Sequence, residues 1–300
     1  MPKTLAIVFS KNRTLQLKSL LMSLQYYSDA KEENIHIVYK ADEGVSYDPL
    51  IKDFKCKFHK QKNFLEDVTN IIRYNDSDYI WFMVDDLIYR DTFSIREIED
   101  FLDDNPNVDS FCLRLGKNIT ANDGQPYFEK DDKDILTWNT KFGQGKHWNY
   151  FWELSSSVYR RNLVLQYISK CRPKRETFPN PFEYHYYSCM PNTRTRGPIG
   201  IYLKLRYPLS GRSKKVACFK NSKCFTHGVN LVADLKDERK ETFSFKELHR
   251  KMLDGYAVDF VSPTNIETPN PGGKFFKIVK IESLQNIIKN NEKTVNHSND

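Results

Sequence analysis

The sequence lacks long hydrophobic runs. Its longest unbroken apolar stretch is six residues, at positions 79–84, whereas a membrane-spanning helix needs roughly 18 or more. The apolar stretch near the N-terminus covers five residues, at positions 5–9, and the core of a secretory signal takes about 7 to 15. These absences predict a cytoplasmic protein that is not integral to a membrane.

Cysteine is scarce, since only six occur in 300 residues. That is too few for a disulfide scaffold in a chain of this length, so we expect reduced thiols. Cys218, Cys224 and His227 lie close together in the sequence, but no fourth ligand of a zinc site is apparent. Zinc is therefore the weaker interpretation of this segment.

The glycine patterns of two common nucleotide-binding loops are missing. Neither G-x-G-x-x-G nor G-x-x-x-x-G-K-[ST] occurs, and the nearest approach, Gly143 and Gly145, lacks the third glycine. This argues against a Rossmann dinucleotide site and against a P-loop.

The excess of positive charge is also small. The 46 basic and 39 acidic residues give a net charge of +7, which favours anionic ligands such as phosphorylated molecules. A nucleic-acid-binding domain is usually more basic. We expect no nucleic-acid partner, and at most peripheral contact with the inner face of a membrane.

What the sequence does contain is an alternation of strands and helices. This pattern predicts an α/β fold with a mostly parallel central sheet flanked by helices, within one large domain. We expect strands at residues 5–9, 35–39, 55–59, 79–84, 108–115, 216–225 and 275–281. We expect helices at residues 15–24, 63–74, 94–102, 157–168, 245–253 and 282–291, and from Asn180 onward, with irregular segments at 116–138 and 191–200.

A polar loop follows the first expected strand. It contains Ser10, Asn12 and Arg13 and leads into a helix. The carboxyl ends of parallel strands are where α/β folds bind ligands, and backbone N–H groups at a helix start suit an anion. Nucleotide recognition and an ordinary helix-capping turn are both open at this point.

Two adjacent carboxylates, Asp85 and Asp86, end the most apolar strand. Two such groups repel each other unless a cation lies between them. Oxygen ligands suit Mg²⁺ or Mn²⁺, and such an ion can neutralise a phosphate leaving group. The alternative is that one aspartate caps the following turn and the other is solvated.

These segments together resemble the nucleotide-sugar half of a GT-A glycosyltransferase, near the family 2 type, over about residues 4–115. The carrying segments are residues 4–13 with the leucine-rich helix after them, the strand that leads to Asp42, and residues 79–86. The resemblance implies that the nucleotide is held by Ser10, Asn12, Arg13 and Asp42, with Asn63 as an additional contact.

The same resemblance implies a metal site for Mn²⁺ or Mg²⁺. The family's D-x-D motif has Val84 in place of its first acid here, so Asp86 is the main expected ligand and Asp85 assists. The segment from Cys224 to Asn230 is similar to one that carries a metal-completing histidine in this family, which implies His227 as the further ligand.

Inverting members of the family place a carboxylate base at a helix start, often as Glu-Asp. Glu183 is similar in position, although Tyr184 stands where the aspartate often is. Asn180 and Glu183 also match a capping box, so a general base and a helix cap both remain open. Glu153 is the reserve candidate for the base.

Aromatic residues gather around this part of the sequence. Trp138, Trp148, Tyr150 and Trp152 could stack on a sugar ring or form core, and core is the commoner outcome for aromatic residues.

The resemblance implies metal-assisted transfer of a sugar from a nucleotide diphospho-sugar to a hydroxyl of a saccharide or lipid-linked acceptor. We expect residues 1–115 to bind the nucleotide, residues 116–240 to bind the acceptor and residues 241–300 to form a helical extension. One alternative is a nucleotidyltransferase acting on a sugar phosphate. Another is a non-catalytic nucleotide- or sugar-binding module, which is favoured if Glu183 is only a cap.

Overall fold

The computed structural model describes residues 3–121, 124–132, 134–143, 147–172, 174–189, 214–229 and 243–297. The strands are β1 (Thr4–Lys11), β2 (Ile35–Lys40), β3 (Lys57–Lys60), β4 (Tyr79–Val84), β5 (Leu87–Tyr89), β6 (Ser110–Cys112), β7 (Lys130–Asp132), β8 (Ile135–Asn139), β9 (Ser157–Arg160), β10 (Lys215–Phe219), β11 (Cys224–Thr226), β12 (Tyr256–Val258) and β13 (Ile278–Lys280). The helices are α1 (Thr14–Tyr27), α2 (Asp48–Asp53), α3 (Phe64–Arg73), α4 (Ile95–Asp104), α5 (Arg161–Ile168), α6 (Pro179–Cys189), α8 (Phe245–Leu253) and α9 (Ile281–His297). Short 3₁₀ turns occupy Glu32–Asn34, Thr140–Phe142 and Gly272–Phe275.

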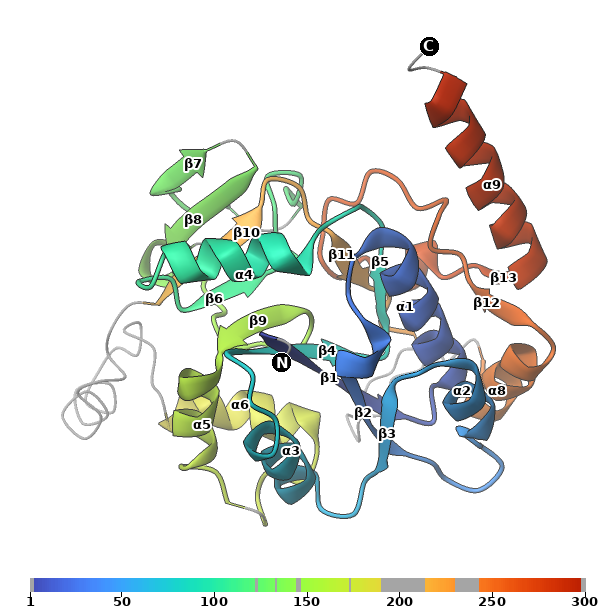
Figure 1. The fold of residues 1–300 in the computed structure, drawn as a ribbon, viewed down its shortest axis with the longest axis horizontal. Coiled ribbons are helices and arrows are strands. Elements are labelled where there is room, and N and C mark those ends of the chain that lie inside the picture. Colours follow the sequence, from blue (N-terminus) through green and yellow to red (C-terminus); the bar gives the residue numbers. More distant parts are fainter. Residues whose placement is uncertain are drawn as a thin grey trace.

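A nine-stranded sheet in the order β3-β2-β1-β4-β9-β6-β10-β8-β7 forms the centre of the molecule (Figure 1). Strands β3, β2, β1 and β4 pair in parallel, and β6 pairs in parallel with β10. Strand β9 runs antiparallel between β4 and β6, and β8 runs antiparallel between β10 and β7. The predicted α/β class with a mostly parallel sheet is confirmed.

Helices cover both faces of this sheet, because alternate side chains of a strand point to opposite faces. Leu5, Ile7 and Phe9 of β1 pack in a buried cluster with residues of α3, α5 and α6. Ala6 and Val8 pack in a second cluster with residues of α1, α4 and α8. Figure 1 shows α3, α5 and α6 together on one side of the sheet and α1 and α4 on the other.

The segment at 157–168 corrects a prediction. Its first four residues form β9, and only Arg161–Ile168 is helical. Val158 and Tyr159 are fully buried, since β9 inserts between two other strands. A segment of four residues with only two apolar side chains fits a strand or a helix equally well by local pattern, so long-range pairing decides. The expected loop at 116–138 likewise contains β7 and the start of β8, and β5, β12 and α2 were not predicted.

The described parts of the three expected stretches are closely joined. Strands β9 and β10, from 116–240, lie in the same sheet as β1 and β4. Helix α8 packs on α1, and His249 Nδ1 lies 2.9 Å from the hydroxyl oxygen of Thr14. The expected loop at 191–200 lies outside the described residues. No helix in the described ranges is long and apolar enough to cross a membrane.

Candidate active site

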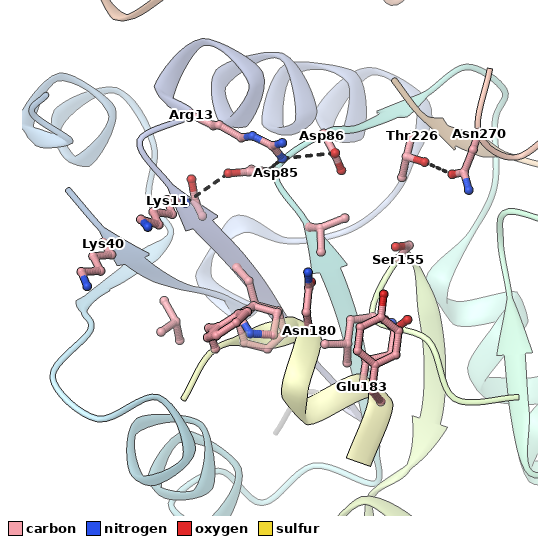
Figure 2. Close-up of a pocket in the computed structure, with 18 of the residues that line it drawn as sticks. Lys11, Arg13, Lys40, Asp85, Asp86, Ser155, Asn180, Glu183, Thr226 and Asn270 are labelled. Atoms are coloured by element: carbon pink, nitrogen blue, oxygen red, sulfur yellow. Dashed lines mark hydrogen bonds and ion pairs between the residues drawn. The ribbon is translucent and has the colours of Figure 1, made fainter. Parts of the chain in front are cut away.

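A pocket of about 710 Å³ opens at the carboxyl ends of β1, β2 and β4 (Figure 2). This volume suits a small-molecule ligand. Its polar lining residues are Ser10, Lys11, Arg13, Lys40, Gln61, Asp85, Asp86, Arg114, His147, Tyr150, Ser155, Thr177, Asn180, Glu183, Tyr184, Thr226 and Asn270. Five of the residues predicted for the site therefore face one cavity: Ser10, Arg13, Asp85, Asp86 and Glu183.

The guanidinium of Arg13 lies between the two paired carboxylates. Its Nη1 is 2.9 Å from Oδ1 of Asp85 and 3.1 Å from Oδ2 of Asp86. The other oxygen of Asp85 accepts the backbone N–H of Lys11 over 3.2 Å. The cation that the adjacent acids require is thus an arginine from the first loop, and both oxygens of Asp85 are engaged.

The two other predicted metal ligands, Asp86 and His227, lie next to each other. The backbone N–H of His227 donates to the carbonyl of Asp86 over 3.1 Å. The imidazole is fully buried and its Nε2 has no hydrogen-bond partner. Burial lowers the pKa of His227 to about 4, so the ring is neutral at pH 7 and able to bind a metal. His227 does not itself line the pocket.

The described residues contain no ready-made group of three or more His, Cys, Asp or Glu side chains placed to hold a metal ion. Asp85, Asp86 and His227 do not form such a group, and neither does the weaker zinc combination of His227 with Cys218 and Cys224. Any ion here would draw most of its ligands from substrate and water, as Mg²⁺ commonly does.

The residues predicted to bind the nucleotide divide into two sets. Ser10 lines the pocket, and its hydroxyl lies 2.7 Å from that of Tyr47. Asn12 instead joins the loops after β1 and β2: its amide donates to Asp42 Oδ2 and its Oδ1 accepts the Asp42 N–H, each over 2.7 Å. Asn12 has φ 59°, a left-handed conformation that asparagine tolerates better than most residues.

Neither Asn12 nor Asp42 lines the pocket. Asn63 also lies outside its lining and caps α3, since its side chain accepts the Glu66 N–H over 3.4 Å. A direct contact with nucleotide stays a prediction for each of these three residues.

Glu183 bonds to a neighbouring segment. The Tyr150 hydroxyl donates to its Oε1 over 2.7 Å, and the Leu154 N–H donates to its Oε2 over 2.9 Å. Asn180 lies inside α6, which begins at Pro179, so it is not the N-cap of this helix. The capping-box interpretation is therefore wrong. Burial raises the pKa of Glu183 to about 6, against the opposing effect of the Tyr150 hydrogen bond.

Glu153, the reserve candidate, is buried and does not line the pocket. It pairs with Nη2 of Arg114, and its Oε1 accepts hydrogen bonds from Ser157 Oγ over 2.7 Å and Cys112 Sγ over 3.2 Å. Because Glu153 lies outside the pocket lining, its carboxylate has no access to an acceptor there.

Of the four aromatic residues, three are core. Trp138, Trp148 and Trp152 have at most 1% of their surface exposed, which confirms the commoner outcome. Tyr150 lines the pocket instead.

Several lining residues were not predicted. Lys11 and Lys40 are the last residues of β1 and β2, so strand ends alone could have indicated them. Arg114, Thr226 and Asn270 carry no comparable local signal, because their meeting depends on distant segments of the chain. Arg114 Nη1 donates to Asn270 Oδ1 over 2.9 Å, and Thr226 also donates to that oxygen.

Part of the chain is similar in sequence to a curated glycosyltransferase. Over 209 residues it is 28% identical to the bifunctional glycosyltransferase pgtA of Dictyostelium discoideum, and the match covers 60% of this chain and 27% of that protein. The chain thus spans about 27% of the length of this relative. No protein-family model matches the chain.

Solved structures are similar at a lower level. S. aureus TarS, residues 1–349, has a TM-score of 0.44 and 13% identity, with 75% of this chain and 60% of that one covered. Mannosyltransferase PcManGT from Pyrobaculum calidifontis, in complex with GDP-Man and Mn²⁺, has a TM-score of 0.33 and 12% identity, with 55% and 46% covered. A cytidylyltransferase from Leptospira borgpetersenii has a TM-score of 0.35 and 11% identity, with 62% of this chain and 70% of that one covered.

The sequence match to pgtA and the observed sheet with its polar strand ends point in the same direction. They confirm the resemblance drawn from the motifs: part of the chain is related in sequence to a glycosyltransferase, and the fold is of the α/β class with a mostly parallel central sheet.

Proposed function

We propose that the chain transfers a glycosyl group from a nucleotide diphospho-sugar to an acceptor hydroxyl, with Glu183 as the general base. The observation that carries this proposal is the position of Glu183. Its carboxylate lines the same pocket as Asp85 and Asp86 but comes from a helix on the opposite wall (Figure 2). A group that leaves at one wall and a base that acts at the other is the arrangement an inverting transfer needs.

In the reaction, the acceptor hydroxyl gives its proton to the Glu183 carboxylate as its oxygen attacks the anomeric carbon. The bond from that carbon to the diphosphate oxygen breaks, and its electron pair leaves with the nucleoside diphosphate. The raised pKa of Glu183, about 6, supports this role, because a base is most effective when its pKa approaches the working pH.

The opposite wall would hold the donor. Lys11 and Lys40 line the pocket at the ends of β1 and β2, where their charges favour phosphate groups. The Asn12–Asp42 hydrogen bonds fix the two loops against each other, and we place the base and ribose over these loops. Asp86 and His227 would hold Mn²⁺ or Mg²⁺, which would neutralise charge on the departing diphosphate.

The acceptor would enter beside α6. Tyr184, the neighbour of Glu183, is 58% exposed and lines the pocket, so a saccharide or lipid-linked acceptor can meet an aromatic ring there. In this proposal residues 1–115 bind the nucleotide of the donor, residues 116–240 carry the base and meet the acceptor while His227 reaches the diphosphate side, and the reaction takes place in the cytoplasm.

Incubation with a panel of nucleotide sugars and Mn²⁺ tests the proposed function. We expect slow hydrolysis of at least one donor to a free nucleoside diphosphate in the absence of acceptor. A parallel incubation holds nucleoside triphosphates and sugar phosphates. Pyrophosphate released there, with no diphosphate from the first panel, would indicate a nucleotidyltransferase. Turnover in neither would indicate a binding module.

A further inference from the structure

A continuous polar wall joins the two reactive ends of the pocket. At one end, the backbone N–H of His227 donates to the carbonyl of Asp86 over 3.1 Å, which places Thr226 beside Asp86. At the other end, the Leu154 N–H donates to Glu183 over 2.9 Å, which places Ser155 beside Glu183. Figure 2 shows Ser155 between these two ends, with Thr226 and Asn270 on the Asp86 side.

Arg114 is the centre of this wall. It is only 6% exposed, yet it lines the pocket. Its Nη2 pairs with the buried Glu153, its Nη1 donates to Asn270 Oδ1, and its Nε has no hydrogen-bond partner. The Glu153 carboxylate thus holds the guanidinium in one orientation, and the guanidinium in turn holds Asn270.

This contact fixes the orientation of the Asn270 side chain. A guanidinium only donates hydrogen bonds, so the amide oxygen of Asn270 must face Arg114. Thr226 donates to the same oxygen, which leaves the amide N–H₂ group as the part that can meet a ligand. Asn270 is exposed at the pocket, and it comes from the C-terminal stretch that was expected only to form a helical extension.

We propose that Arg114, Thr226 and Asn270 form the subsite for the donor sugar, and that the Asn270 amide selects the sugar by a hydrogen bond to one of its hydroxyls. This inference rests on the proposed function. The sugar must lie between its diphosphate, near Asp86, and the base that activates the acceptor, Glu183. The polar wall covers that interval, and an oriented amide donor distinguishes sugars by where they carry an oxygen.

Titration calorimetry with UDP, UDP-glucose, UDP-galactose, UDP-N-acetylglucosamine, GDP and GDP-mannose tests this subsite. In the wild-type protein we expect one nucleotide sugar to bind more tightly than the others. Asn270→Ala should weaken the affinity for that nucleotide sugar by about tenfold, the effect of losing one good hydrogen bond. The affinity for the bare nucleoside diphosphate should stay within about twofold of the wild-type value. Thr226→Val, which keeps the shape but removes the orienting hydroxyl, should give a smaller loss of the same kind.

Asn107→Ala is the matched control, because Asn107 is exposed in a turn outside the pocket; all its affinities should match the wild type. The subsite is contradicted if Asn270→Ala leaves every affinity unchanged, or lowers the affinities for bare diphosphates and nucleotide sugars equally. A wild-type protein that binds none of the six compounds would overturn the proposed function itself, and the subsite with it.

Discussion

The hydroxyl of Tyr150 donates a hydrogen bond to Oε1 of Glu183 over 2.7 Å. The Tyr150 ring stacks on that of Tyr187, with 4.6 Å between the ring centroids. Tyr187 is itself fixed, because its hydroxyl donates to the carbonyl of Trp152 over 2.8 Å and accepts the N–H of Trp152 over 2.7 Å. The candidate base is therefore held by a side chain that is packed in place.

Replacing Tyr150 with Phe should shift the pH dependence of transfer. The hydrogen bond from Tyr150 lowers the pKa of Glu183, so its loss should raise that pKa and move the acidic limb of the pH–rate profile to higher pH. At pH 7 kcat should fall by about threefold to tenfold. Tyr127→Phe, at an exposed tyrosine outside the pocket, should leave the pH–rate profile unchanged. If the acidic limb of Tyr150→Phe stays at the wild-type pH, this contact does not set the pKa of the base.

Glu183 should also make stability depend on pH. Its pKa is raised from 4.5 to about 6, so between these values the folded chain binds more protons than the unfolded chain. Its contribution to stability then falls as pH rises through this window. The melting temperature of Glu183→Gln should rise relative to that of the wild type between about pH 4.5 and about pH 6. Above pH 6 the difference between the two should stay constant. Parallel curves would contradict the raised pKa.

Replacing Arg13 with Gln should destabilise the fold. The change leaves Asp85 and Asp86 buried without their shared cation, and breaking a buried pair in this way costs about 3 to 5 kcal/mol. Arg13→Lys should cost less, because it keeps the charge but loses the planar fork. Chemical denaturation measures both. Arg96→Gln, which breaks an exposed pair with Asp100 at 3.9 Å, should have little effect; equal losses in Arg13→Gln and Arg96→Gln would show that Arg13 does not neutralise the acids.

Replacing Asp86 with Asn should remove the gain in nucleoside-diphosphate affinity that Mn²⁺ provides. Asp85→Asn should keep most of that gain, because both oxygens of Asp85 are already engaged by Arg13 and the Lys11 N–H. Calorimetry with and without Mn²⁺ measures the effect, and Asp48→Asn, at an exposed residue outside the pocket, is the control. A Mn²⁺-dependent gain that survives in Asp86→Asn would remove Asp86 as the metal ligand.

Local pattern was sufficient for much of the first half of the fold, although α2 and β5 were missed. Strand β4 begins and ends at the predicted residues, and the helix predicted at 94–102 starts after its N-cap, Ser94. Apolar periodicity and polar side chains at strand ends determine these features within a few residues of sequence. β9 was missed because pairing with β4 and β6 decides its conformation.

The site was predictable to the same extent. Ser10 lies in the last two residues of β1, and Arg13 and Asp86 come two residues after β1 and β4. Their presence at one sheet edge therefore follows from the parallel order. That Arg13 occupies the position between the acids could not be seen in the sequence, because the side chains meet only after folding. Asn270 reaches Arg114 from 156 positions away, and no local pattern records such a contact.

The most direct test of the account is transfer by Glu183→Gln, measured beside donor binding and melting temperature. Glutamine keeps the length of the side chain, and its amide can still bond to the Leu154 N–H and the Tyr150 hydroxyl. We predict transfer slowed by about 10² to 10⁴-fold, donor affinity near that of the wild type, and a melting temperature at pH 7 no lower than the wild type. Transfer at close to the wild-type rate would contradict the assignment of Glu183 as the base.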